Sequence, residues 1–359
     1  MLSLNTIPRW TWALPVIAWG AMFASPFAGE ATLFLLLVGV ALAGTVFAAV
    51  HHAEVVAHRV GEPFGTLVLA LAVTVIEVAL IISVMLPGGE AKAALARDTV
   101  FAAIMIVCNG IVGLCLLLGG LRHREQDFQL RGASTAMTVL ASLAVLTLIL
   151  PSYAQAMPGP FLGSTQLAFI GVVSLLLYGT FVFVQTIRHR DYFLAEGSNE
   201  DAHAAPPSIR VTWVSVGLLL LCLVAVVGLA KVLSPAVELA VANAGAPEAV
   251  VGIVIAGLVL LPEGIAAARA ARADRLQTSL NLALGSALAT IGLTIPTVAI
   301  IFVITGQPLL LGLPMKETVL LALTLLVGSM SLATGRTTVL QGIVHLVIFA
   351  SFFFFAVVP

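Results

Sequence analysis

Apolar stretches long enough to cross a membrane recur from one end of this 359-residue chain to the other. Hydrophobic residues make up 60% of the chain, charged residues only 9%, and the mean hydropathy is +1.14. A helix of about 20 apolar residues spans a hydrocarbon core of about 30 Å. The pattern therefore predicts an all-α, polytopic membrane protein. The formal net charge of -1 gives no indication of nucleic-acid binding.

Hydropathy and helix-breaking residues together predict about eleven transmembrane helices. The stretch 235–268 is too long for one crossing, so its first part, "SPAVELAVANAGAP", is expected to be interrupted or amphipathic before a span that begins near Glu248. Pro15 within the first helix, and the single Arg9 ahead of it, favour an uncleaved helix over a signal peptide. We expect helices near residues 10–27, 31–57, 63–86, 97–121, 130–150, 163–187, 209–233, 235–268, 276–303, 314–333 and 337–357.

Positive side chains are distributed unequally between the two ends of these helices. If the N-terminus is cytoplasmic, twelve of the sixteen lysines and arginines fall on the cytoplasmic side, which agrees with the positive-inside rule. The most polar loop, residues 188–208, then becomes a cytoplasmic linker near the middle of a single integral membrane domain, residues 1–359. The cysteines lie in apolar segments without metal-ligand spacing, which predicts packing roles; they are Cys108, Cys115 and Cys222.

An internal repeat emerges when the chain is shifted by 186 residues. The segment "GEPFGTLVLALAVTVIEVALI" then lies over "PEAVVGIVIAGLVLLPEGIAA", which pairs Glu62 with Glu248 and Glu77 with Glu263. The predicted halves, residues 31–187 and 209–357, each hold five helices, with 10–27 as an extra N-terminal helix. Because five is odd, the halves enter the membrane from opposite sides. Such inverted repeats place a transport site at their interface near the midplane, where we expect the glutamates to face each other.

Glu77 and Glu263 are costly inside a membrane, because a charged side chain at a helix centre costs on the order of 2.5 to 3.5 kcal/mol. No basic residue lies within either span to neutralise them. Removal from water and mutual repulsion both disfavour the ionised form, so without a cation at least one glutamate is expected to hold a proton near neutral pH. A pair of carboxylates that binds either protons or a cation has the chemistry of an antiporter.

Calcium suits two carboxylates, because it accepts six to eight oxygen ligands in flexible geometry, whereas magnesium demands a tight octahedron. We expect Glu77 and Glu263 to bind transported Ca²⁺, with no resident cofactor. Hydroxyl and amide groups serve equally as ligands or as contacts that hold helices together. Carbonyls freed by unwinding near Pro262 are a further source of oxygen. The supporting ligands expected from side chains are Thr74, Asn109, Ser286 and Thr290.

Several segments of the chain resemble a known family. They are the two glutamate segments, "LPEGIAAARAARADRLQTSLNLALGSALATIGLTIP" and "LATGRTTVLQGIVHL". The chain resembles the bacterial calcium/proton antiporters of the ChaA type, in the CAX branch of the calcium/cation antiporter superfamily. The resemblance covers nearly the whole chain. It implies an eleven-helix exchanger in the bacterial cytoplasmic (inner) membrane, in which Glu77 and Glu263 bind calcium and protons alternately. It also implies that sodium or potassium can be exchanged for protons on the same scaffold.

Two departures from the family pattern bear on function. The central linker has only scattered acidic residues where relatives often carry a dense acidic tract, which argues against calcium sensing there. The first repeat has Ile104 and Met105 where the wider family often shows Gly-Ser, so its helix is expected to supply fewer ligands than that of the second repeat.

The remaining function classes are a sodium or potassium/proton antiporter and a cation channel, whose flux would not depend on a pH gradient. An enzyme is not expected, because no metal-ligand or nucleophile pairing is present. The histidine-rich stretch "HHAEVVAH" does not match the HExxH motif of zinc proteases. It predicts either a polar helix end or an entry funnel for protons or cations. His345 is expected to be a hydrogen-bonded packing residue. Partners are membrane lipid and inorganic cations, and no feature fixes an oligomeric state.

Overall fold

The computed structural model describes residues 7–29, 31–61, 64–154, 162–193, 206–306 and 309–358. Within these residues, eleven helices are long and apolar enough to cross a membrane, which confirms the predicted number of crossings. Their spans are Arg9–Ala28, Thr32–Val60, Val68–Leu86, Leu95–His123, Leu130–Tyr153, Ser164–Arg188, Ile209–Asn243, Ala249–Arg272, Leu276–Thr305, Met315–Leu332 and Val339–Val357. Glu62 of the sequence repeat and residues 194–205 of the predicted linker lie outside the described residues.

Several spans are built from more than one helical segment. The first half comprises α1 (Arg9–Ala28), α2 (Thr32–Val60), α3 (Phe64–Gly88), the 3-10 turn η1 (Gly89–Lys92), α4 (Leu95–Met105), the π-helical η2 (Ile106–Ile111), α5 (Val112–His123), α6 (Leu130–Ala144), the π-helical η3 (Val145–Ile149), the 3-10 turn η4 (Leu150–Tyr153), α7 (Ser164–Phe183), the π-helical η5 (Val184–Arg188) and the 3-10 turn η6 (Arg190–Tyr192).

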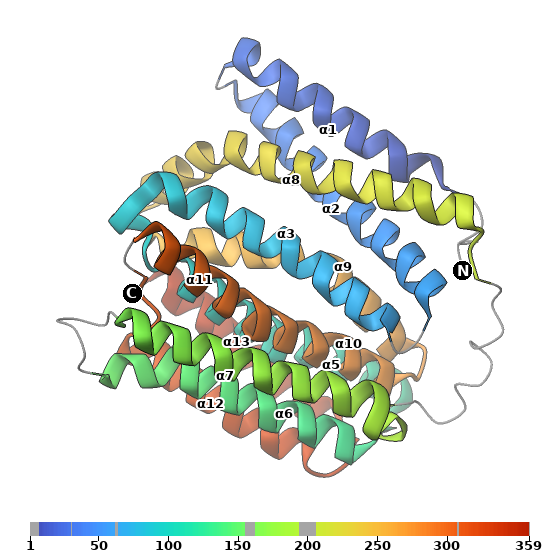
Figure 1. Cartoon of the computed structure of the whole chain (residues 1–359). Coiled ribbons are helices and arrows are strands. Elements are labelled where there is room, and N and C mark those ends of the chain that lie inside the picture. The colour runs from blue at the N-terminus through green and yellow to red at the C-terminus, as the bar shows by residue number, and fades with distance from the viewer. Residues whose placement is uncertain are drawn as a thin grey trace.

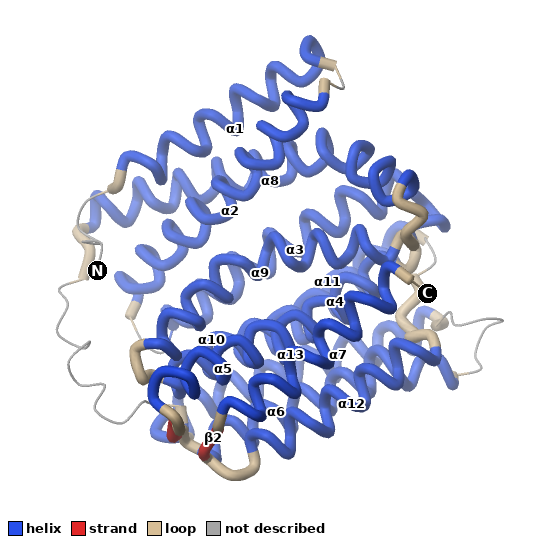
Figure 2. Tube along the Cα trace, turned by 180° about the vertical axis from the view of Figure 1, so that it is seen from behind, coloured by secondary structure: helices blue, strands red, loops and turns tan. Residues whose placement is uncertain are grey.

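The second half has fewer interruptions. Its elements are α8 (Ile209–Asn243), α9 (Ala249–Arg272), α10 (Leu276–Ala289), the π-helical η8 (Thr290–Thr294), α11 (Ile295–Thr305), α12 (Met315–Leu332) and α13 (Val339–Val357). Two short strands, β1 (Gln126–Asp127) and β2 (Arg336–Thr337), pair antiparallel and connect the halves at one end of the helices (Figure 2).

One predicted boundary is wrong. The sequence suggested an interruption from residue 235, but α8 runs unbroken through Pro235 to Asn243, and the break comes at residues 244–248 instead. A proline removes only one backbone hydrogen bond of the helix, and a helix of 35 residues retains many others. Gly245, with a φ of +67°, stops the helix, because left-handed backbone suits a residue without a Cβ.

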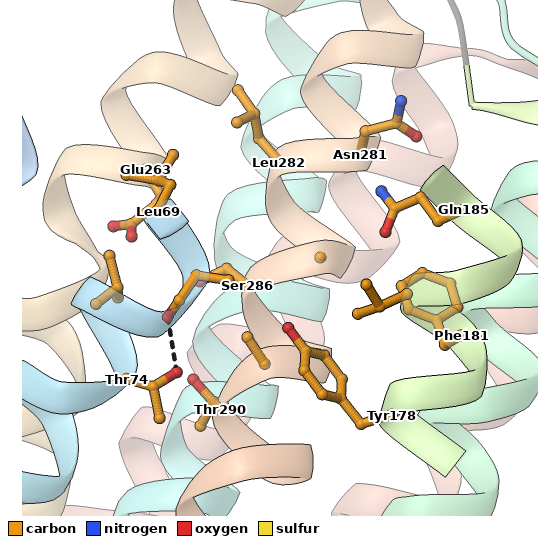
Figure 3. A pocket seen from close by; sticks show the side chains of 15 residues that line it. Leu69, Thr74, Tyr178, Phe181, Gln185, Glu263, Asn281, Leu282, Ser286 and Thr290 are labelled. Carbon is orange, nitrogen blue, oxygen red and sulfur yellow. Dashed lines mark hydrogen bonds between the residues drawn. The ribbon is translucent and has the colours of Figure 1, made fainter. Parts of the chain in front are cut away.

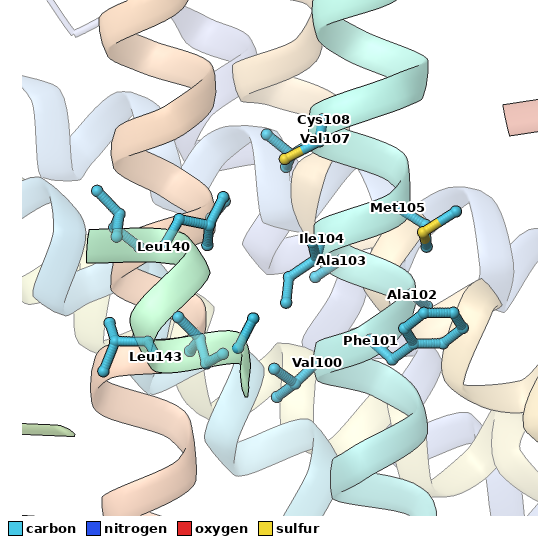
Figure 4. Close-up of a cluster of buried hydrophobic side chains, with 14 of the residues drawn as sticks. Val100, Phe101, Ala102, Ala103, Ile104, Met105, Val107, Cys108, Leu140 and Leu143 are labelled. Carbon is cyan, nitrogen blue, oxygen red and sulfur yellow. The ribbon is translucent and has the colours of Figure 1, made fainter. Parts of the chain in front are cut away.

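The helices pack around two apolar clusters. In Figure 1, α1, α2 and α8 lie together, and α3 and α9 lie between them and the remaining helices. The smaller cluster joins α1, α2 and α8 to apolar side chains of α3 and α9 such as Ile76 and Val259. The larger cluster fills the space among α4, α5, α6 and α10, and Figure 4 draws part of it. Helices α3 and α9, which carry the paired glutamates, therefore lie at the boundary between the two clusters.

The two halves share a local irregularity. Each has a π-helical turn in the span that follows its glutamate helix, η2 in the first half and η8 in the second. Shifting η2 by the 186 residues of the sequence repeat brings it over residues 292–297, which overlap η8. Wide turns of this kind are frequent at functional sites. This correspondence agrees with the predicted duplication.

Helices α5 and α13 approach closely at two glycines. A Cβ added to Gly342 would lie 2.5 Å from the backbone nitrogen of Leu117, and one added to Gly113 would lie 2.9 Å from Cβ of His345. Small residues allow helix backbones to pack tightly in membranes, where apolar side chains gain little from leaving lipid. The contact fixes α13, and with it His345, against the span that contains η2.

Candidate cation site

Glu77 lies on α3 and is only 2% exposed. Its Oε2 accepts a hydrogen bond of 2.9 Å from the hydroxyl of Thr290, which opens η8 in the other half of the chain. Its Oε1 is buried and accepts no hydrogen bond from any described residue. Thr294, one turn beyond Thr290, also has a buried hydroxyl without a hydrogen-bond partner in the described part of the chain.

Glu263 lies on α9, which packs against α4 and α10. The expected unwinding at Pro262 is absent, because α9 is continuous from Ala249 to Arg272. The proline only deprives the carbonyl of Leu258 of its usual amide partner. Oε2 of Glu263 is buried and has no hydrogen-bond partner among the described residues. Its electrostatic neighbours include two acidic side chains, Glu54 and Glu77.

A cavity of about 120 Å³ lies beside Glu263 (Figure 3). It is formed by α3, α7, η5, α9, α10 and η8, and four of the predicted site residues line it: Thr74, Glu263, Ser286 and Thr290. Thr74 donates its hydroxyl hydrogen to the carbonyl of Ala70 on its own helix, at 2.9 Å. Glu77 is not part of the lining, but Thr290 contacts both Glu77 and the cavity. Thr290 thus joins Glu77 to the wall of the cavity that Glu263 also lines.

Asn109 lies elsewhere, in η2. Its Nδ2 donates a 2.8 Å hydrogen bond to the hydroxyl of Thr324 on α12, and its Oδ1 lies 3.1 Å from Nδ1 of His345 on α13. The other ring nitrogen of His345 lies 3.1 Å from the hydroxyl of Ser331. Because an amide oxygen only accepts, the ring proton belongs on Nδ1. The structure thus places Asn109 in a network that fixes η2 to α12 and α13, and His345 is buried and hydrogen-bonded as predicted.

The two halves contribute unequal side chains at corresponding positions. Thr290 and Thr294 lie 186 residues after Ile104 and Cys108, respectively. Both residues of the first half are buried in the larger apolar cluster and bring no carboxylate or hydroxyl oxygen. The second half therefore supplies the hydroxyl groups around Glu77, which agrees with the expectation from Ile104 and Met105 that the first repeat is poorer in ligands.

Comparison with known proteins identifies this arrangement. The family described as sodium/calcium exchanger protein matches residues 30–187 and 214–358, two stretches that together cover most of the chain. The chain belongs to the sodium/calcium exchanger family. It is therefore a multi-pass membrane antiporter of inorganic cations.

Relatives and solved structures resemble this exchanger over nearly all of its length. The protein y4hA of Sinorhizobium fredii is 52% identical, over 98% of this chain and 97% of its own. The sodium-potassium/proton antiporter ChaA of Escherichia coli is 36% identical, over 93% of this chain and 90% of its own. The crystal structure of the Ca²⁺/H⁺ antiporter YfkE covers 98% of this chain and 100% of its own with a TM-score of 0.72, at 15% identity. At this identity, the similarity to YfkE concerns the fold alone.

Sequence reasoning missed the contribution of α7 and η5 to the exchanger's cavity. Tyr178 of α7 and Gln185 of η5 line the cavity together with Asn281 of α10. The amide of Asn281 is engaged on both sides, because it accepts from Gln277 at 2.9 Å and donates to the carbonyl of Phe193 at 2.5 Å. A glutamine inside the apolar run "FVFVQTIRHR" was the available signal, but polar residues near the end of a span are common and do not reveal which face they occupy.

The electrostatics of the exchanger's site limit what it can hold. Among the described residues, neither Glu77 nor Glu263 forms an ion pair with a lysine, arginine or histidine. A buried carboxylate without a counter-charge is stabilised by binding a proton or a metal cation. Each glutamate has one buried oxygen that accepts no hydrogen bond from the part of the chain that the structure describes. Those two oxygens are where a proton or a cation can bind.

Proposed function

We propose that the exchanger moves cytoplasmic Ca²⁺ out in exchange for external protons by alternating access, with Glu77 and Glu263 binding Ca²⁺ or protons in turn. The observation that supports this most is a pair of buried carboxylates that have no ion-pair partner among the described residues, with Glu263 on the cavity and Glu77 bonded to Thr290 of its lining. Two carboxylates balance the charge of Ca²⁺, and the hydroxyl groups of Thr74, Ser286 and Thr290 are further oxygens of the kind it prefers.

The orientation of the exchanger is inferred from where the cavity lies. The lining residues of α9 and of the span Leu276–Thr305 belong to the halves that adjoin an arginine-rich connection, which contains Arg269, Arg272 and Arg275. Connections rich in arginine lie on the cytoplasmic side of a membrane. By this rule the cavity of this conformation faces the cytoplasm, and the N-terminus lies on the same side. The membrane in which we expect the exchanger to work is the bacterial inner membrane.

A second candidate is sodium or potassium exchange for protons on the same scaffold. It is favoured by the name of the 36% identical relative ChaA, a sodium-potassium/proton antiporter. Monovalent cations also bind to carboxylate and hydroxyl oxygens, and one glutamate is enough to balance their charge. Under this alternative, Glu77 and Glu263 keep the same roles, but one of them holds a proton while the other binds the cation.

The test uses everted membrane vesicles that carry a respiration-generated pH gradient, followed by dequenching of acridine orange. Addition of Ca²⁺ is expected to dissipate the gradient in vesicles with the natural protein, and the assay is repeated with sodium, potassium and magnesium. Glu77→Gln and Glu263→Gln keep the side-chain shape but cannot ionise, so each is expected to abolish the response. Glu248→Gln is the matched control, because that side chain is 69% exposed at the start of α9.

Retained exchange in either glutamine variant would refute the assignment of the site. Cation flux that persists without any pH gradient would instead indicate a channel. A response to sodium or potassium and none to Ca²⁺ would select the second candidate.

A further inference from the structure

The cavity beside Glu263 has a closed counterpart in the opposite half of the chain. Because inverted repeats are related by a two-fold axis in the membrane plane, a cavity between α3 and α10 near one face corresponds to a region between α9 and α4 near the other. A shift of 186 residues converts the lining residues of α10 and η8 into six positions that are at most 5% exposed. These positions are Leu95, Ala96, Thr99, Val100, Ala103 and Ile104. The same shift converts Glu263, which lines the cavity, into Glu77, which does not.

Thr99 of α4 and Gly252 of α9 meet in this closed region. A Cβ added to Gly252 would lie 3.0 Å from the backbone nitrogen of Thr99 and 3.2 Å from its hydroxyl oxygen. Gly285 is the residue that corresponds to Thr99, and a Cβ added there would meet open space beside the cavity. Helices α4 and α9 are therefore in direct contact where the corresponding parts of α10 and α3 are separated.

The packing of α3 and α9 differs in the same sense. Helix α9 packs along α4 and α10, whereas α3 contacts these two helices at few positions and packs on α2 and α8 instead. The sequences of α3 and α9 correspond, so the chain holds both arrangements of one duplicated helix. The reverse arrangement, with α3 on α10 and α9 turned toward α2 and α8, would close the present cavity and open the region between α4 and α9.

Two oxygens that belong to this region lack partners. Thr99 is 0% exposed, and its hydroxyl group forms no hydrogen bond with any part of the chain that the structure describes. Other buried threonines, such as Thr45 and Thr147, donate to the carbonyl four residues earlier. Oε1 of Glu77 likewise accepts no hydrogen bond within the described ranges. Because unpaired buried polar groups are unfavourable, these two oxygens are expected to gain partners in another conformation.

We propose that α4 and α9 separate to form the external passage of the exchanger, with Thr99 in its wall and Glu77 at its inner end. The passage would admit hydrated inorganic cations and protons, and the hydroxyl group of Thr99 would face their water. The inference rests on the proposed function, because alternating access requires a second opening on the face away from the arginine-rich connection. It assigns one glutamate to each opening, Glu263 to the present cavity and Glu77 to the external passage.

The experiment measures how fast a charged, membrane-impermeant thiol reagent labels Thr99→Cys in right-side-out vesicles. Serine replaces the three natural cysteines in every variant, so that labelling reports only the introduced thiol. Thr45→Cys is the matched control, because Thr45 is equally buried at 0% exposure but lies on α2 and already donates to the carbonyl of Ala41. Thr99→Cys is expected to react and Thr45→Cys to remain protected.

Gly252→Ala adds the Cβ that the closed contact excludes, so it is expected to favour the separation of α4 and α9. Overpacking of this kind corresponds to an increase of about 5- to 150-fold in the labelling rate of Thr99→Cys. Gly257→Ala is the control on the same helix, because a Cβ there meets open space. Ser286→Cys, in the wall of the present cavity, is expected to react more slowly in everted vesicles when Gly252→Ala is present, because the cavity closes as the passage opens.

The outcomes separate this inference from the proposed function. If Thr99→Cys reacts no faster than Thr45→Cys, both with the natural Gly252 and with Gly252→Ala, the passage between α4 and α9 is refuted, while loss of exchange in the two glutamine variants would still support the glutamate site. If both glutamine variants transport normally, the proposed function fails whatever the labelling shows. Faster labelling of Thr99→Cys by Gly252→Ala, with slower labelling of Ser286→Cys, supports the external passage.

Discussion

Substitution of Thr290 by valine tests the contact on which the candidate site depends. The hydroxyl of Thr290 donates a 2.9 Å hydrogen bond to Glu77 Oε2, and each residue is only 2% exposed, so no bulk water can replace the lost donor. Valine keeps the branched shape and removes only the donor. A hydrogen bond to a charged group is worth about 1.5 to 3 kcal/mol, which corresponds to a factor of about 10 to 150 in an equilibrium constant.

The lost donor stabilised the ionised carboxylate, which is the form that binds a cation. Thr290→Val is therefore expected to weaken cation binding about 10- to 150-fold at a fixed pH, and to move the pH dependence of exchange in the alkaline direction. The assay is proton release from purified protein on addition of Ca²⁺, sodium or potassium, measured across a range of pH. Thr297→Val is the matched control, because its hydroxyl bonds to the carbonyl of Leu293 on an exposed part of the same span.

An unchanged half-saturating concentration and an unchanged pH profile in Thr290→Val would refute the reasoning. That result would mean that Glu77 does not need to ionise when the cation binds. A variant that loses both cation binding and thermal stability would be resolved by Thr290→Ser, which keeps the hydroxyl and is expected to restore the affinity.

Two further predictions concern stability in detergent, measured as the midpoint of thermal unfolding. Asn109→Leu is expected to destabilise the fold by about 1 to 3 kcal/mol, because it leaves the buried Nδ1 of His345 without an acceptor. The control Asn243→Leu, at the exposed end of α8, is expected to change the midpoint little. Equal midpoints for the two variants would show that the fold does not need the hydrogen-bond network of Asn109. Gly342→Leu is expected to lower the midpoint strongly, because its Cβ would lie 2.5 Å from the backbone of Leu117. Gly217→Leu is the control, because a Cβ at Gly217 meets open space. A midpoint for Gly342→Leu that matches this control would contradict the close packing of α5 and α13.

The number and kind of helices could be predicted from sequence because membrane solvation imposes a length on every apolar run. The eleven crossings come directly from that constraint, and the structure confirms them. The error near residue 235 has a physical origin, because a proline signals a break only when the surrounding helix is short of other contacts. In α8, Leu233 packs on the smaller apolar cluster just before Pro235 and Val237 packs on the larger cluster just after it, so the helix continues through Pro235.

The site was only partly predictable. The 186-residue spacing could pair Glu77 with Glu263, because two acids within matching apolar runs are rarely accidental. It could not show that Thr290 contacts Glu77 or that Asn109 contacts Thr324, since these contacts join residues 213 and 215 positions apart and depend on how each helix is rotated. The same rotation decides whether Gln185 faces lipid or the cavity. Hydropathy alone carries no information about the rotation of a helix around its axis.

The unequal chemistry of η2 and η8 has a consequence for the transport cycle. An exchanger built from two identical halves would present equivalent binding sites, related by a two-fold axis, to the two compartments and work equally well in both directions. Here Thr290 and Thr294 occupy the positions that correspond to Ile104 and Cys108 in the other half, so the ion is surrounded differently when the site opens to each side. The cation concentrations that half-saturate the carrier should therefore differ between its two faces. The rates of exchange in the two directions would then differ under matched gradients, although the gradients alone still decide which direction prevails.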